Sequence, residues 1–184
     1  MTFLPLVASL LAGAPQYITE TVESAPGRLG AGARMTWLQP PLADARLWID
    51  GHVVIRPIPR IVLTGAWGRS EETRRGLGQD TTVSEMRWDL GVGAVIVQGA
   101  GADLYIPALW RHSSQKHSRL GEAAWTEIGT GLGVLAALKG NFGLRSELLW
   151  ATPSSPHQDL LLGAGRESDG SHLELSLGFV AYLN

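Results

Sequence analysis

The chain has 184 residues, a length that suits one domain, and its formal net charge at pH 7 is −2. A charge this close to zero gives no electrostatic footprint for nucleic acid, so we expect no nucleic-acid partner. Cysteine is absent, which excludes disulfides and thiolate metal sites. No apolar run reaches the roughly 18 residues that a membrane-spanning helix needs. Charged residues make up only 17% of the chain, below the roughly 25% typical of soluble domains.

The first residues are expected to stand apart from the fold. The short apolar stretch 3–11 is followed by the small residues Ala12, Gly13 and Ala14, which is the order found in secretory signal peptides. We therefore interpret residues 1–25 as a signal peptide or a disordered N-terminal segment. Residues 26–184 are expected to form the folded domain.

Strict alternation of apolar and polar residues then recurs along most of the chain. It is clearest in 83–97, where Met86, Trp88 and Leu90 alternate with charged residues and glycines. Period-two alternation predicts strands with one apolar face. In chain order the expected strands are Arg28–Leu38, Arg46–Arg56, Arg60–Arg69, Val83–Val97, Asp103–Arg111, Thr126–Ala137, Phe142–Trp150 and His172–Leu183. Most have about 9 to 13 residues, the length that a tilted strand needs to cross a bilayer.

The connections between these strands alternate in length. Three short ones contain proline or glycine: Pro57–Pro59, Gln98–Gly101 and Lys139–Asn141. The others are longer or proline-rich and are expected to be loops: Gln39–Ala45, Ser70–Thr82, His112–Glu122 and Ala151–Ser171. Short turns at one end and longer loops at the other are typical of outer-membrane barrels. The sequence therefore predicts an all-β, eight-stranded, antiparallel up-and-down transmembrane β-barrel.

Large aromatic residues fall at two levels of the expected barrel. Five tryptophans share outward parity near the longer connections: Trp37, Trp67, Trp88, Trp110 and Trp150. Phe142 and Phe179 have the same parity near the opposite end. Amphipathic rings favour the level of the lipid headgroups, so we interpret these residues as two membrane-interface belts.

The opposite row of the strands carries the charges. The residues expected to form a charge network in the lumen are Arg34, Asp50, His52, Arg56, Glu85, Arg87, Asp89, Arg145, Glu147 and Glu174. Buried charges must be paired, and this set contains both signs. A soluble lipocalin-like binder, with the apolar row inside, has the same alternation and stays an alternative. The polar row favours the bilayer, because it has few lysines and many glycines, which suit a crowded lumen better than a soluble exterior.

From Arg28 to Asn184 the chain resembles the small eight-stranded outer-membrane barrels of the OmpA and OmpX type. Its last strand is similar to their C-terminal assembly signal in the alternation of Phe179, Ala181 and Leu183, although Asn184 stands where a terminal aromatic is usual. The resemblance implies a monomer in the bacterial outer membrane, in contact with the lipid bilayer and its lipopolysaccharide and inserted by the barrel-assembly machinery. It also implies a structural or surface-interaction role. Because eight strands leave an interior just wide enough for side chains, we expect the charge network to plug the lumen, with a narrow gated pathway for water or ions as the alternative. We expect no cofactor.

One alternative function is enzymatic. His112, Ser113 and Ser114 follow the fifth expected strand and resemble the arrangement in lipid A deacylases, which are also small barrels. A nucleophilic serine needs a base within hydrogen-bond reach and a third group to orient it, for which Glu122 or Glu127 is available. These residues are the candidates for an outer-leaflet lipid-modifying site.

Two further patterns carry little weight. His112, His117 and His157 could gather around a metal, but no carboxylate spacing fixes their geometry, so we expect no metal site. The glycine-rich stretch 129–133 lacks the strand–turn–helix context of a nucleotide site.

Overall fold

The computed structural model describes residues 29–39, 46–75, 80–99, 101–138, 140–155, 157–158, 167–168 and 170–183. Residues 1–25, expected to be a signal peptide or a disordered segment, lie outside these ranges, as does the connection 40–45. Within the described ranges there is no helix with the length and apolar character needed to span a membrane.

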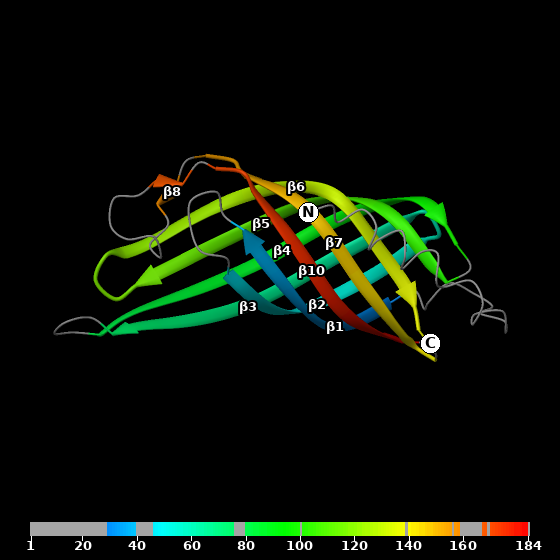
Figure 1. Ribbon diagram of the computed structural model, residues 1–184, viewed down its shortest axis with the longest axis horizontal. Coiled ribbons are helices and arrows are strands. Elements are labelled where there is room, and N and C mark those ends of the chain that lie inside the picture. Colours follow the sequence, from blue (N-terminus) through cyan, green and yellow to red (C-terminus); the bar gives the residue numbers. More distant parts are fainter. Residues whose placement is uncertain are drawn as a thin grey trace, which may run out of the picture.

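Eight antiparallel strands close into one barrel (Figure 1). The strands are β1 (Leu29–Gln39), β2 (Arg46–Ile58), β3 (Ile61–Arg75), β4 (Asp80–Gln98), β5 (Ala102–His117), β6 (Gly121–Ala137), β7 (Phe142–Pro153) and β10 (His172–Leu183). Consecutive strands pair from β1 to β7, β7 then pairs with β10, and β10 closes the barrel on β1, from Leu29↔Leu183 to Gln39↔Leu173. Two-residue strands β8 (His157–Gln158) and β9 (Glu167–Ser168) pair with each other in a separate sheet. The predicted up-and-down barrel is confirmed.

Alternation determines which side chains face inward. Leu90 and Leu175 are 55% and 51% exposed on the outer surface, whereas Arg87 and Glu174 are 3% and 1% exposed. The charged row therefore lines the interior and the apolar row faces outward. A lipocalin-like barrel requires the reverse arrangement, which this chain does not adopt.

Four strands continue beyond the closed part of the barrel. Pairing of β2 with β3 ends at Gly51↔Trp67, but pairing of β3 with β4 continues to Arg75↔Asp80. Pairing of β5 with β6 likewise continues to His117↔Gly121. Strands β3 to β6 therefore form a projecting sheet at one end of the barrel (Figure 1, left).

The predicted loops 70–82 and 112–122 are wrong in large part, because both belong mainly to this projecting sheet. In these segments the alternation of apolar and polar residues stops where the closed barrel ends. The backbone hydrogen bonds of β3 with β4 and of β5 with β6 nevertheless continue. A polar strand without an apolar face has the composition of a loop, which explains the error.

A buried apolar layer fills the interior near the short turns. Its members are Val54, Val62, Val95, Tyr105, Leu135, Val180 and Tyr182. Beyond this layer, Arg56 Nη1 lies 2.7 Å from Asp103 Oδ2 at the mouth of the barrel. The charged side chains of the middle of the barrel thus lie between this layer and the projecting sheet.

Candidate functional site: the polar interior and the outer rim

Arg111, on β5, is the centre of the polar interior. Its Nε donates to Asp89 Oδ1 at 2.8 Å, its Nη1 to Glu127 Oε2 at 3.1 Å, and its Nη2 to Glu174 Oε2 at 2.8 Å. Nη1 also contacts Glu174 Oε1. The guanidinium is 1% exposed and binds carboxylates from β4, β6 and β10. One arginine therefore joins four strands.

Arg34, on β1, extends the same set of contacts to the other side of the lumen. Its Nε and Nη2 donate to the two oxygens of Asp50 at 2.9 and 2.7 Å, the bidentate geometry that gives arginine–carboxylate pairs their strength. Nη2 also donates to Asp89 Oδ2 at 2.6 Å. Asp89 therefore connects Arg34 with Arg111.

A second cluster lies on β7 and β5. Arg145 Nη2 donates to both oxygens of Glu147 at 2.8 Å, and the Tyr105 hydroxyl donates to Glu147 Oε1 at 2.7 Å. Arg145 Nε donates to the same hydroxyl at 3.1 Å. Arg34 Nη1 lies 4.0 Å from Glu147 Oε2, which brings the two clusters into contact.

Arg87 completes what we call the interior network. Its Nε and Nη2 lie 3.9 Å from Asp89 Oδ1 and 3.8 Å from Glu174 Oε2, and its guanidinium lies 5.2 Å from the centroid of the Trp48 ring. The interior network consists of Arg34, Asp50, Arg87, Asp89, Tyr105, Arg111, Glu127, Arg145, Glu147 and Glu174. Every barrel strand except β3 contributes to it.

The predicted lumen residues are all buried, but they do not form one cluster. Besides the network members, Arg56 pairs with Asp103, and Glu85 Oε2 accepts a hydrogen bond from Gln115 Nε2 at 3.1 Å. His52 is 3% exposed, and neither ring nitrogen has a hydrogen-bond partner among the described residues.

The predicted set omitted three members of the network, Tyr105, Arg111 and Glu127. A signal for Arg111 was present, because its neighbour Trp110 was assigned to the outward row and successive side chains of a strand face opposite sides.

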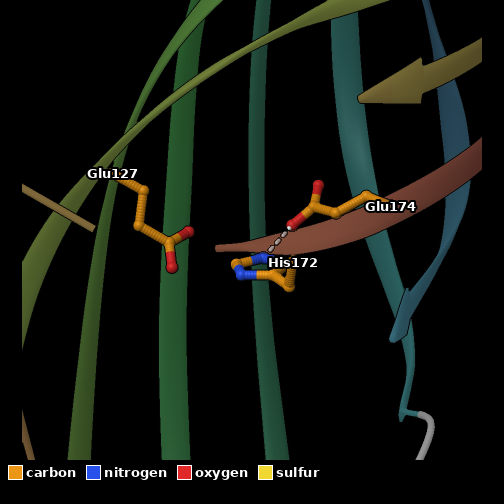
Figure 2. Close-up of side chains that lie close together, drawn as sticks. All are labelled: Glu127, His172 and Glu174. Carbon is orange, nitrogen blue, oxygen red and sulfur yellow. Dashed lines mark hydrogen bonds and ion pairs between the residues drawn. The ribbon is translucent and has the colours of Figure 1, made fainter. Parts of the chain in front are cut away.

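Two members of the network and a histidine beside them have the donor types of a metal site. Glu127, His172 and Glu174 each offer one ligand atom, and these atoms lie within 4.8 Å of one another (Figure 2). His172 Nε2 lies 2.9 Å from Glu174 Oε1. The Arg111 guanidinium already binds both carboxylates, however, and its positive charge opposes a cation at the same place. The geometry therefore favours an ion-pair cluster over a metal centre.

The residues considered for catalysis lie on different faces of β5. Ser113 is buried in the interior, whereas His112 and Ser114 face outward. The His112 ring lies 5.6 Å from Trp88, centroid to centroid. Glu122 Oε1 lies 2.8 Å from Lys116 Nζ, a contact that holds the pKa of Glu122 below its usual value and raises the pKa of Lys116. The described side chains are therefore not arranged as a nucleophile, base and acid.

The histidines considered as metal ligands are also dispersed. His117 Nδ1 accepts hydrogen bonds from the backbone N–H groups of Arg119 and Leu120 at 3.0 and 3.1 Å, which occupies that nitrogen within the β5–β6 turn. His112 packs against Trp88, and the side chain of His157 lies outside the described part of the structure.

The aromatic residues assigned to the outer surface lie there in the structure. Trp37, Trp67, Trp110 and Trp150 are exposed, as are Phe142 and Phe179 at the other end, and Trp88 is half-buried. Trp88 is the cross-strand partner of Trp67 and forms an edge-on contact with Trp110, with ring centroids 4.7 Å apart. Indole rings therefore form a continuous patch where the projecting sheet leaves the barrel.

No protein-family model matches the chain, and no curated protein matches it. Solved structures do match. Ail, the attachment invasion locus protein of Yersinia pestis, has a TM-score of 0.53 at 11% identity, covering 83% of this chain and 95% of that chain. Neisserial surface protein A has a TM-score of 0.53 at 12% identity, covering 84% of this chain and 96% of that chain. The structure of Ail in complex with the heparin analogue sucrose octasulfate has a TM-score of 0.54 at 12% identity, covering 83% of this chain and 95% of that chain.

At these identities the likeness establishes the fold and nothing finer. The chain has the fold of the small eight-stranded outer-membrane β-barrels, and the resemblance drawn from its sequence is confirmed at that level.

Proposed function

We propose that the protein is an integral outer-membrane barrel with a structural or surface-interaction role. The observation that carries this proposal is the distribution of side chains across the barrel wall. Leucines and tryptophans on the outer surface are about half exposed, whereas Arg111 and Glu174 in the interior are each 1% exposed. Such a surface is unfavourable in water and favourable in hydrocarbon, where closed barrels satisfy every backbone hydrogen bond.

The lumen supports a plugged barrel and not a pore. Arg34 reaches Asp50 and Asp89, Arg111 reaches Glu127 and Glu174, and these contacts cross the interior at the level of the network. The apolar layer around Tyr105 and Leu135 fills the interior nearer the short turns. Eight strands enclose a space that side chains can fill, so both layers oppose a continuous water column.

The projecting sheet supports a role at the cell surface. Strand β3 pairs with β4 along Gly68–Arg75, and among the described residues no strand pairs with its other side. This edge carries free backbone groups, which are suited to pairing with an extended segment of another protein. Charged residues along β3 protect the same edge from non-specific association.

Insertion and assembly state follow from the same arrangement. The outward row of β10, with Phe179, Ala181 and Leu183, is proposed to be the segment that the barrel-assembly machinery recognises. A barrel closed by β1 and β10 has no free edge within the wall, which supports a monomer.

Fractionation of cells producing the full chain tests the location. The folded protein should be recovered with outer membranes and should run faster on SDS gels before boiling than after it. Recovery only as a detergent-free soluble monomer would overturn the proposal. Planar-bilayer recordings test the plug, since the folded barrel should show no resolved unitary conductance; steady open channels would leave the membrane location intact and overturn the plug.

A further inference from the structure

A hollow of about 390 Å³ lies on the outward face of the projecting sheet. The residues of that face that line it are Arg69, Ser84, Met86, Ser114, Lys116, Glu122 and Ala124. They share outward parity on β3, β4, β5 and β6, and together they define what we call the rim groove.

Strand register places the rim groove directly beyond the indole patch. Trp67, Trp88 and His112 are successive cross-strand partners on β3, β4 and β5. Two residues further along these strands, Arg69 pairs with Met86, and Met86 pairs with Ser114. Because outward tryptophans favour the level of the lipid headgroups, the rim groove opens where headgroup sugars and phosphates lie.

The rim groove combines two cations and the Glu122 carboxylate with hydroxyl groups. The side chains of Arg69 and Lys116 are 63% and 71% exposed. Ser84 is the cross-strand partner of Lys116, and Ser114 is the partner of Met86, which also pairs with Arg69. Strands β3 and β5 are separated only by β4, and Arg69 and Lys116 are offset by two residues along them, because the β3 residue level with Lys116 is Glu71. Their backbones are therefore about 12 Å apart. An arginine and a lysine can reach one phosphate from that separation, and the guanidinium fork matches its oxygens.

Two acidic residues partly neutralise these cations, but their contacts are weak. Arg69 Nη2 lies 3.9 Å from Glu71 Oε2, beyond hydrogen-bond distance. Lys116 Nζ lies 2.8 Å from Glu122 Oε1 with both side chains largely in solvent. Exposed ion pairs of this kind contribute little, so a phosphate bearing more than one charge competes with them for both cations.

We propose that the rim groove binds the phosphorylated sugar headgroup of an outer-leaflet glycolipid. The phosphate lies between Arg69 and Lys116, hydroxyls of the sugar contact Ser84 and Ser114, and the sugar ring packs on Met86. This inference rests on the proposed membrane location and adds a specific lipid partner to it. A lipid in the same leaflet is the occupant that the position favours, because its acyl chains then lie along the outward face below Trp67 and Trp88.

Native mass spectrometry of the full chain, folded in detergent, tests the site. The protein is mixed with lipid A carrying its phosphates, with dephosphorylated lipid A, or with phosphatidylglycerol, and retained lipid is counted. We expect the double variant R69A/K116A to retain about thirtyfold less phosphorylated lipid A than the wild type, from the loss of two cations near the headgroup plane. Arg60→Ala is the matched control, because Arg60 is also exposed but lies at the β2–β3 turn at the other end.

Several results would overturn the inference. These are equal retention by the wild type and R69A/K116A, an equal loss in Arg60→Ala, or equal retention of dephosphorylated lipid A. Displacement of lipid A by millimolar inorganic phosphate would reveal a site for free phosphate in place of a lipid site. Failure of the barrel proposal is distinguishable, since it would appear in the same preparation as loss of the faster unboiled form on SDS gels.

Discussion

Arg34 and Asp89 lie 55 positions apart in the chain, yet Arg34 Nη2 is 2.6 Å from Asp89 Oδ2 in the centre of the barrel. Arg34 is on β1 and Asp89 is on β4, and β2 and β3 lie between these two strands in the barrel wall. The contact therefore crosses the lumen. The inward row of β3 leaves room for this crossing because its side chains are small: Val62, Thr64, Ala66 and Gly68. At Gly68, an added Cβ would lie 2.6 Å from Trp48 Nε1. Small residues on one strand thus permit long charged residues on the others.

Arg111→Ala should destabilise the barrel strongly. The change leaves Asp89, Glu127 and Glu174 without their shared cation in a buried place, and breaking such a pair costs about 3–5 kcal/mol. The measurement is the urea midpoint for loss of the faster unboiled form in detergent. Arg69→Ala, which removes an exposed arginine, is the matched control and should leave that midpoint nearly unchanged. Equal midpoints for the two variants would show that the interior network does not stabilise the fold.

Gly133→Ala should destabilise the barrel through Tyr105. Gly133 and Tyr105 are cross-strand partners, and an added Cβ would lie 2.3 Å from Tyr105 Cζ. The ring cannot move freely toward β4, because it already lies against Gly93 on the other side. Overpacking of this kind costs about 1–3 kcal/mol, and displacing the ring also disturbs the hydrogen bond of Tyr105 to Glu147.

Gly51→Ala is the matched control for that experiment. Its added Cβ would meet nothing nearer than Trp67 O at 3.9 Å, on the outward face. Its urea midpoint should therefore be equal to or above that of the wild type, since alanine suits a strand better than glycine does. A midpoint for Gly133→Ala that matches this control would contradict the close packing around Tyr105.

Leu90→Arg should impair membrane insertion. Leu90 lies on the outward row in the middle of β4, and an arginine near the bilayer midplane of a barrel costs about 2–4 kcal/mol. Leu120→Arg provides the comparison, because Leu120 is also exposed but lies at the β5–β6 turn beyond the barrel. The yield of folded protein after refolding into phospholipid vesicles should fall for Leu90→Arg only. Equal yields would show that Leu90 does not face hydrocarbon.

The closed part of the barrel was predictable because each strand there faces two different environments. In β10, Leu175 and Leu177 alternate with Glu174 and Ser176, so the sequence itself records which side chains face inward. The strand ends were not predictable in the projecting sheet, where both faces of β3 are polar from Ser70 onward and the alternation disappears.

The sequence predicts which charged residues face the lumen, but it does not predict which of them pair with one another. Parity shows that Arg34 faces inward, but the sequence does not show that its guanidinium crosses to Asp89 on β4, because this depends on the stagger of the strands around the barrel. The rim groove was missed for a related reason. Arg69 and Lys116 lie on strands separated by β4, and Lys116 had been assigned to a loop.

His112→Ala should leave the acylation of lipid A unchanged. The His112 ring packs against Trp88, and Ser113 faces the interior, so neither side chain is arranged to activate a nucleophile with the other. The test is mass spectrometry of lipid A extracted from cells that produce the wild type, His112→Ala or Ser114→Ala, with cells lacking the protein as the baseline. All four profiles should be the same. A deacylated species present only with the wild type, and lost in both variants, would establish a lipid-modifying site on the outer face of β5, which His112 and Ser114 share.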